Sequence, residues 1–235
     1  MMSEDLISVI MSSYNSEETI EKSILSILKQ DYKNIEFLIA DDCSKDSTLN
    51  IMKRLREDDK RIKIIENKKN IGLTKSLNKL LNISNGKYIA RQDSDDVSLS
   101  HRLTTQINFI KKTNSEVVTS RAIIKDTGEK IPKYSYLLPN NLVMKYKNPF
   151  IHGTLFVDKN VFKKVGGYDE NFYFAQDYKF YKDCYNYGKK IIVLNEVLYE
   201  LNNKNNISNK YKKDQEYYFN CARKNIVPDT LKTNT

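Results

Sequence analysis

Short apolar runs alternate with amphipathic segments along the first half of the chain. The runs at residues 6–11, 35–40, 62–65 and 88–90 have the length and composition of buried strands. Between the first two runs, residues 19–29 place their isoleucine and leucine side chains on one face of a predicted helix. Strands that alternate with helices are typical of βαβ units, so the sequence predicts an α/β fold with a mostly parallel sheet.

Polar residues and glycines predict where two further helices begin and end. The Ser, Asp and Thr residues at positions 44–48 are expected to cap the helix after the second strand. Gly86 is expected to end the helix that carries Leu73, Leu77 and Leu80, because glycine adopts the left-handed conformation common at helix ends.

The second half of the chain is less regular. Residues 121–136 contain turn markers and predict a hairpin or loop, whereas residues 154–157 and 191–194 have the composition of short strands. A helix is expected over residues 175–187. A polar linker and a basic, tyrosine-containing helix that ends near Ile226 follow it.

Composition excludes several classes of protein. The chain has 235 residues, of which 40% are hydrophobic and 29% charged, and these values are typical of a soluble globular domain with a sizeable core. With 7 Gly and 4 Pro it is neither collagen-like nor of low complexity. No basic leader and no apolar stretch of about 18 residues is present, so we expect a cytoplasmic location, with peripheral membrane contact as an open alternative.

Net charge and the numbers of cysteines and histidines limit the classes of partner and of metal site. The 39 Lys and Arg against 30 Asp and Glu give a net charge of +9, which favours an anionic partner such as nucleic acid, a phosphorylated substrate or an acidic membrane. The lysines are scattered, so the charge also fits a plain compositional bias. Three separated cysteines and two histidines support neither a disulfide framework nor a zinc site, so any metal should be held by oxygen atoms.

Three of the predicted strands end in polar clusters. These are residues 12–15, Asp41 with Asp42, and residues 93–96. Ligands of open α/β sheets bind at the carboxyl ends of the strands, so we expect the clusters to converge. Asp93, Asp95 and Asp96 can offer hard oxygen ligands to Mg²⁺ or Mn²⁺, although a solvated, helix-capping loop would have the same sequence.

Other polar residues each allow two interpretations. Asp42 can accept the imide N–H of a uracil ring or cap the next helix, and Tyr14 can flank a base or be an ordinary loop residue. Asn70 suits a turn, and Lys75 can meet a diphosphate or only solvent.

Two candidates lie in the second half of the chain. Asp177 begins a predicted helix, where a carboxylate can accept a proton or simply complement the helix dipole. His152 can line an acceptor site or serve the structure.

The order of five segments resembles that of one enzyme family. SVIMSSYN, LIADDCSKDST, NKKNIGLTKSLN, GKYIARQDSDD and VGGYDENFYFAQDY occur in the order found in the inverting family 2 glycosyltransferases of the GT-A fold. The resemblance covers about residues 6–201. It implies a Rossmann-like, mostly parallel sheet flanked by helices, with a small antiparallel element on the acceptor side.

The resemblance also implies a division of the chain. Residues 1–201 would form the glycosyltransferase domain, with the nucleotide-sugar half at about 1–113 and the acceptor half at about 114–201. Residues 202–235 would form the polar linker and the basic helical tail, through which the protein could contact a membrane.

Residue roles follow from the same resemblance. The residues implied to bind the nucleotide-sugar are Ser12, Tyr14, Asn15, Asp42, Asn70, Lys75 and Asp93. Asp93 and Asp95 match the DxD motif, which holds a divalent metal, Mn²⁺ or Mg²⁺, and Asp96 is a neighbouring candidate. The residues implied on the acceptor side are His152, Gly167, Tyr168 and Gln176. Asp177 matches the catalytic base.

The implied reaction is a metal-assisted single displacement of the hexosyltransferase type. A sugar passes from a nucleotide-sugar, most commonly a UDP-sugar, to a hydroxyl of a glycan or lipid-linked acceptor in polysaccharide biosynthesis. Three positions depart from the family pattern. The proline usual after the DxD loop is missing from residues 99–102, Gln176 replaces an acidic residue, and Asn202 and Lys204 replace an Arg and a His.

Three other functions stay open. A sugar-phosphate nucleotidyltransferase needs a glycine-rich loop after the first strand, where this chain has SSYNSEE. A non-enzymatic module could bind nucleic acid or anionic lipid through its basic surface, although nucleic acid is not the partner we expect. A degenerate transferase would bind the nucleotide-sugar without turnover.

Overall fold

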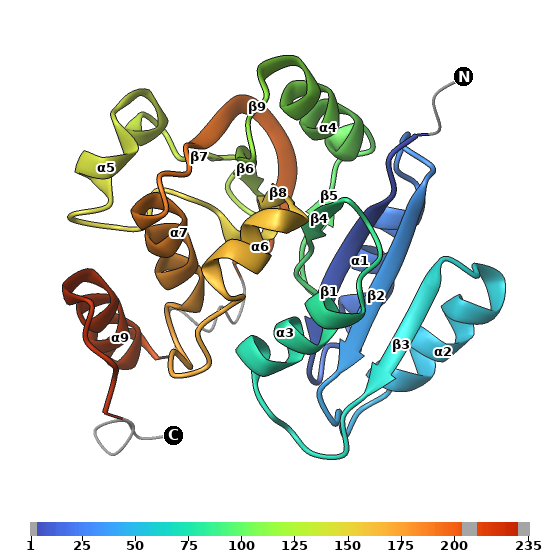
Figure 1. The fold of residues 1–235 in the computed structure, drawn as a ribbon. Helices are drawn as coiled ribbons and strands as arrows, with labels where there is room; N and C mark the ends of the chain where they lie inside the picture. Colours follow the sequence, from blue (N-terminus) through green and yellow to red (C-terminus); the bar gives the residue numbers. More distant parts are fainter. Residues whose placement is uncertain (1–3, 204–210, 230–235) are drawn as a thin grey trace.

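A single sheet organises the chain (Figure 1). The computed structural model describes residues 4–203 and 211–229, in which nine strands form one sheet. Eight strands follow the order β3-β2-β1-β4-β8-β6-β9-β5, and β7 pairs with β6. The predicted α/β architecture is therefore confirmed.

The first half of the sheet is parallel. β1 (Ile7–Ser13) lies between β2 (Ile35–Asp41) and β4 (Tyr88–Arg91), and β3 (Ile62–Glu66) pairs with β2 on the outer side. Every residue of β1, β2 and β4 is buried. Parallel strands covered on both faces need continuous apolar runs, and these are the runs seen in the sequence.

The second half of the sheet is mixed. β8 (Phe156–Asp158) runs antiparallel to β4 and to β6 (Val117–Ile124), while β6 pairs in parallel with β9 (Ile191–Leu201). β5 (Val97–Ser98) and β7 (Lys130–Ile131) add antiparallel pairs. This is the antiparallel element that was expected beside the parallel half.

Helices cover both faces of the sheet. They are α1 (Ile20–Leu28), α2 (Thr48–Asp58), α3 (Leu73–Ile83), α4 (Arg102–Thr113), α5 (Asn140–Val143), α6 (Lys159–Val165), α7 (Gln176–Asn186) and α9 (Lys212–Lys224). Short 3₁₀ turns occur at Ser135–Leu137 and His152–Thr154. The side chain of Ile10 joins the core under α3, and those of Val9 and Met11 join the core under α1 and α2, as the alternation of a strand requires.

One expected helix end was wrong. Helix α3 ends at Ile83, and Ser84 leaves it in an extended conformation, so Gly86 does not end it. A Cβ atom on Gly86 would lie 2.4 Å from the backbone nitrogen of Ser8. Gly86 is thus needed where the chain passes close to β1. At the start of α2 the N-cap residue, Ser47, makes no side-chain capping hydrogen bond, and Asp46, one residue earlier, accepts a hydrogen bond from the backbone N–H of Thr48 at 3.0 Å.

Several elements were not predicted. Among them are the helices α4, α5 and α6 and the start of β6, which begins four residues before the expected hairpin. The hairpin itself is confirmed by the pairing of Ala122 with Ile131. β9 continues to Leu201, seven residues beyond the predicted end of this strand, because its second part pairs with β6 after a register shift.

The basic helix α9 packs against α7. The rings of Tyr178 and Phe219 lie 4.3 Å apart, and Tyr218 contacts the rings of Phe172 and Phe174. Its aromatic face is therefore used within the fold. Lys204 and most of the polar linker lie outside the described residues.

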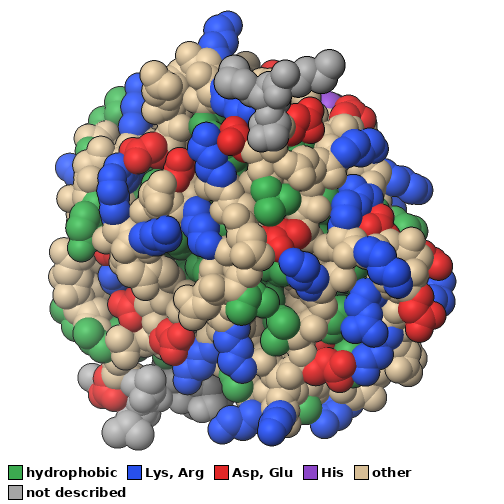
Figure 2. Space-filling model, turned by 45° about the vertical axis from the view of Figure 1, so that its right-hand side comes forward, with side chains coloured by type: hydrophobic (Ala, Val, Ile, Leu, Met, Phe, Trp, Pro, Cys, Tyr) green, Lys and Arg blue, Asp and Glu red, His purple; other side chains and the backbone are tan. Residues whose placement is uncertain are grey.

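Surface charge is dispersed on the face seen in Figure 2. Lysine and arginine side chains alternate there with acidic ones and form no continuous basic stripe. Within the part of the chain that the structure describes, no helix combines the length and the apolar character needed to cross a membrane.

Candidate active site

The polar clusters at the strand ends converge, as the sequence predicted. Ser13 and Asp41 are register partners in β1 and β2, and the backbone N–H of Asp42 donates to the Ser13 carbonyl at 2.8 Å. The hydroxyls of Ser16 and Ser94 lie 3.1 Å apart, which ties the loop after β1 to the loop after β4. One edge of the parallel sheet thus carries all three clusters.

The loop after β1 forms one side of this edge. Ser12 is buried, whereas the Tyr14 side chain is 46% exposed and free to contact a ligand. Asn15 has a positive φ of 48°, and its side-chain oxygen accepts a hydrogen bond from the backbone N–H of Lys45 at 2.8 Å. Asn15 therefore fixes the loop on which Tyr14 is presented.

Asp42 holds the loop that leads into α3. Its Oδ1 accepts hydrogen bonds from Asn67 Nδ2 and from the backbone N–H of Ile71, both at 2.9 Å. Its Oδ2 accepts one from the backbone N–H of Gly72 at 2.8 Å. A carboxylate has about four acceptor positions, so this buried group retains one for a further donor.

Asn70 and Lys75 line a cavity of about 390 Å³ at the start of α3. The Asn70 side chain accepts a hydrogen bond from the backbone N–H of Gly72 at 3.1 Å, and Lys75 is exposed. The ring of Tyr173 forms the opposite wall, 3.0 Å from where a Cβ on Gly72 would lie. Asn70 and Lys75, which were both predicted to lie along the donor, thus line the same cavity.

Three residues that the sequence did not single out determine the position of Asp93. Its Oδ1 accepts a hydrogen bond at 2.5 Å from Arg91, whose side chain is fully buried, and its backbone N–H donates to the Tyr199 hydroxyl at 3.0 Å. A Cβ on Gly153 would lie 2.8 Å from Asp93 Oδ2, so only glycine leaves room for this carboxylate. The remaining guanidinium nitrogens of Arg91 have no hydrogen-bond partner in the structure.

The neighbouring carboxylates repel one another. Burial, and then the charge of Asp93, raise the pKa of Asp95 to about 6. Burial and the charges of Asp93 and Asp95 raise the pKa of Asp96 to about 8. Asp96 also accepts a hydrogen bond from the backbone N–H of Asn202 at 2.8 Å, which anchors the end of β9.

A divalent cation suits this donor set. It would relieve the repulsion between Asp93 and Asp95, and carboxylate oxygens are the ligands Mg²⁺ and Mn²⁺ take. Among residues 4–203 and 211–229, no three His, Cys, Asp or Glu side chains form a ready metal-binding group. One or two carboxylates, completed by water and substrate phosphates, fit such a site better than a closed protein cage.

Asp177 lies in the first turn of α7. Its Oδ2 accepts a hydrogen bond from Asn148 Nδ2 at 2.7 Å. Burial raises the pKa of Asp177 to about 6, and the charge of Asp93 adds to this increase. A carboxyl group with this pKa is ionised near neutral pH and is a better proton acceptor than an ordinary aspartate.

The acceptor-side candidates lie next to one another. His152 Nε2 and the Tyr168 hydroxyl are 2.8 Å apart, and burial, followed by the nearby Arg91, lowers the pKa of His152 well below its usual range. Asn78 on α3 bonds both the backbone N–H and the carbonyl of Tyr168. Gly167 supports this turn with a φ of 85°. The neutral histidine therefore serves as a hydrogen-bonding group here.

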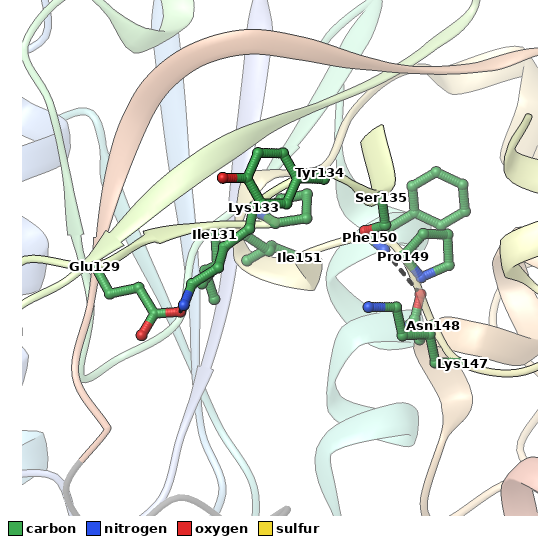
Figure 3. A pocket seen from close by; sticks show the side chains of 11 residues that line it. Glu129, Ile131, Lys133, Tyr134, Ser135, Lys147, Asn148, Pro149, Phe150 and Ile151 are labelled. Carbon is green, nitrogen blue, oxygen red and sulfur yellow. Dashed lines mark hydrogen bonds and ion pairs between the residues drawn. The ribbon is translucent and has the colours of Figure 1, made fainter. Parts of the chain in front are cut away.

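A second cavity lies beside Asp177, and Figure 3 shows the side chains that line it. It has a volume of about 540 Å³ and is lined by both apolar and lysine side chains, among them Tyr134, Lys147 and Phe150. Asn148, the partner of Asp177, also belongs to its wall. Gln176 begins α7 and is buried.

The loop after the acidic cluster lacks the usual proline but is tied by hydrogen bonds. Leu99 donates its N–H to Leu198, and its carbonyl accepts a hydrogen bond from Gln30 Nε2 at 2.8 Å. Arg102 is fully buried and donates hydrogen bonds to Gln92, Ser98 and Gln106 and to the carbonyls of Arg91 and Leu155. Hydrogen bonds thus provide the constraint that the missing proline would have provided.

Comparison with known proteins gives a consistent result. The sequence profile described as Glycosyl transferase family 2 matches residues 8–166. The putative glycosyltransferase EpsE of Bacillus subtilis is 40% identical over 171 residues, which is 72% of this chain and 62% of EpsE. The Escherichia coli UDP-Glc:alpha-D-GlcNAc-diphosphoundecaprenol beta-1,3-glucosyltransferase WfgD is 34% identical over 64% of this chain and 67% of its own. The chain spans about three fifths of the length of EpsE.

Solved structures share the fold. Residues 1–349 of S. aureus TarS, in complex with UDP-GlcNAc, superpose with a TM-score of 0.72 at 26% identity, over 85% of this chain and 59% of that one. The mannosyltransferase PcManGT from Pyrobaculum calidifontis, in complex with GDP-Man and Mn²⁺, gives a TM-score of 0.73 at 17% identity, over 92% of this chain and 62% of that one. The expected GT-A fold is therefore confirmed.

Proposed function

The chain belongs to glycosyl transferase family 2, and from that premise we propose that it transfers a sugar from a UDP-sugar to a hydroxyl of a glycan or lipid-linked acceptor, with inversion at the anomeric carbon. The observation that carries the proposal is the placement of Asp177. This carboxylate has a raised pKa, lies within electrostatic reach of Asp93, and is held by a residue of the larger cavity.

Asp177 is the catalytic base in this proposal. The acceptor oxygen forms a bond to the anomeric carbon as the bond from that carbon to the diphosphate oxygen breaks. The acceptor proton passes to Asp177, and the diphosphate leaves with the electron pair of the broken bond. Asn148 keeps the carboxylate oriented through its hydrogen bond of 2.7 Å.

The donor would lie along the strand ends. Ser12, Tyr14 and Asn15 would border the nucleoside, and the free acceptor position on Asp42 would receive the imide N–H of uracil. Lys75 at the mouth of the smaller cavity would meet the diphosphate. The UDP-GlcNAc complex of a protein with the same fold supports a uridine donor.

Asp93 and Asp95 would hold a divalent metal, either Mn²⁺ or Mg²⁺. When bound, the metal supplies Lewis-acid stabilisation of the leaving diphosphate. Asp96 is the weaker candidate ligand, because one of its oxygens already accepts a hydrogen bond from Asn202. Arg91 positions Asp93 through its hydrogen bond, and Gly153 leaves the carboxylate space.

The larger cavity is the proposed acceptor site. His152, which directly follows the cavity-lining Ile151, would shape the approach of the acceptor hydroxyl together with Gly167, Tyr168 and Gln176. The name of WfgD describes a lipid-linked sugar diphosphate acceptor, and this relative supports an acceptor of that class.

Calorimetric titration with UDP, GDP, CDP and dTDP, each with and without Mn²⁺, tests the donor assignment. We expect UDP to bind and to require the metal for full affinity. Asp95→Ala should weaken this binding, whereas Asp177→Asn should preserve it and reduce transfer by about 10²–10⁴-fold. Transfer at the parental rate by Asp177→Asn would disprove the base assignment, and nucleotide binding without any turnover by the parental chain would favour a degenerate transferase.

A further inference from the structure

We propose that residues 134–146 form a membrane-docking surface that binds an anionic lipid bilayer beside the acceptor cavity. The inference rests on the proposed function for its biological meaning, because a lipid-linked acceptor resides in such a bilayer. Binding of the surface to lipid can nevertheless be measured without any transfer reaction. We call residues 134–146 the docking segment.

Large apolar side chains are exposed on this segment. Five of the twelve exposed large hydrophobic side chains among the described residues belong to it, within thirteen consecutive positions. Their exposed fractions are Tyr134 76%, Leu137 69%, Leu138 57%, Leu142 50% and Tyr146 81%. The three leucines are the only exposed leucines in that set. Single exposed hydrophobic residues are ordinary, but a cluster of this kind marks an interaction surface.

The segment is anchored, so its exposure is a property of the fold. Val143 and Met144 are buried, and the Met144 carbonyl accepts a hydrogen bond from the Tyr178 hydroxyl of α7 at 2.7 Å. Leu142 and Tyr146 are four residues apart, in α5 and the turn that follows it. They therefore lie on the same side, away from the buried Val143 and Met144. In Figure 1, α5 stands at the periphery of the molecule.

Charge identifies the partner. Residues 130–147 contain Lys130, Lys133, Lys145 and Lys147 and no acidic residue. Lys133 pairs with Glu129 at 2.9 Å, and Lys130, Lys145 and Lys147 add positive charge around the apolar residues. Leucine and tyrosine side chains flanked by lysines match the interface of an anionic bilayer. A second copy of this surface would be repelled by the same charges.

The docking segment borders the acceptor cavity. Tyr134 and Ser135 line the cavity, and Lys147 follows the segment directly at its rim, as Figure 3 shows. The next residue, Asn148, holds Asp177. A lipid-linked acceptor whose chain stays in the bilayer could therefore present its sugar hydroxyl to the base. The aromatic face of the basic tail, through which membrane contact was expected, packs on α7.

Vesicle co-sedimentation of the full chain tests the proposal. We expect binding to vesicles of phosphatidylcholine with phosphatidylglycerol, and at least tenfold weaker binding to phosphatidylcholine alone. The triple variant Leu137→Ser, Leu138→Ser, Leu142→Ser should lose at least tenfold in affinity for the anionic vesicles. A matched control, Ile83→Ser with Tyr185→Ser, removes exposed apolar side chains elsewhere and should bind like the parental chain.

Two further variants test whether the tail helix binds the vesicles and whether vesicle binding depends on catalysis. The double variant Lys212→Gln, Lys213→Gln on α9 should leave vesicle binding unchanged. A loss of vesicle binding in this variant would show that the basic tail, and not the docking segment, contacts the membrane. Asp177→Asn should bind vesicles normally, so a failed transferase assignment and a failed docking assignment give different results. Absence of vesicle binding, unchanged binding by the leucine variant, or a dimer that the leucine variant dissociates would each overturn the proposal.

Discussion

Two opposing effects determine the pKa of the Asp177 carboxyl group. Burial raises its pKa to about 6, while the hydrogen bond from Asn148 stabilises the charged form and limits that increase. Because the base must be ionised to accept a proton, kcat/KM should fall by about tenfold per pH unit below pH 6. A pH profile of transfer with metal and donor in excess measures this limb.

The variant Asn148→Ala tests whether Asp177 is the group that causes the fall of kcat/KM at low pH. Loss of the hydrogen bond should move the acid limb to higher pH, because the charged form of Asp177 loses its stabilising donor. The carboxylates at the end of β4 should be unaffected by this variant. An acid limb that stays at the parental pH in Asn148→Ala would show that another group controls it.

Gly153 shows how a residue without a side chain can determine a site. A Cβ at this position would lie 2.5 Å from the Tyr199 hydroxyl and 2.8 Å from Asp93 Oδ2, closer than real contacts allow. Gly153→Ala should therefore displace Asp93 and weaken metal-dependent UDP binding by at least tenfold, as titration calorimetry would show. Gly128→Ala is the control, because it meets nothing within 4 Å and should alter only stability. Equal UDP affinity in both variants would contradict the proposed role.

Strand ends were the part of the site that could be predicted from the sequence. Apolar runs fix the parallel strands, and parallel strands bring residues 12–15, 41–42 and 93–96 to one edge whatever the loops do. Asn148 and Tyr199 could not be found in this way, because long loops and the mixed half of the sheet bring them close. Arg91 could have been found from the sequence, because it is a charged residue at the end of an apolar strand.

The tail helix α9 supports the segment that carries the base. Tyr218 is buried and contacts Phe172 and Phe174, just before Asp177 along the chain. Tyr218→Ala should destabilise the fold by about 3 kcal/mol and lower kcat more than the affinity for UDP. Thermal unfolding and steady-state kinetics measure both effects. Lys213→Ala on the exposed face should change neither, and a parental kcat in a folded Tyr218→Ala chain would contradict the supporting role.

The whole molecule carries its acidic site at a cost to stability. The pKa of Asp95 and that of Asp177 are each raised to about 6, and that of Asp96 to about 8, so the folded chain binds more protons than the unfolded chain. Without metal, the free energy of unfolding should therefore fall as the pH rises from about 4 to about 8. Glu36 and His152 act in the opposite direction. Glu36, whose pKa is lowered to about 2, does so only at lower pH, and His152, whose pKa is lowered by burial, offsets part of the effect between pH 4 and 8 because it is one group against three carboxyls. Mn²⁺ with UDP should restore stability at pH 7.5, by about 2.7 kcal/mol at 100 times the dissociation constant. Denaturant unfolding at several pH values measures this, with Asp95→Ala as the variant that should respond less to the metal. Stability that rises towards pH 8 without metal, or an equal response of Asp95→Ala, would contradict a cation site at the end of β4.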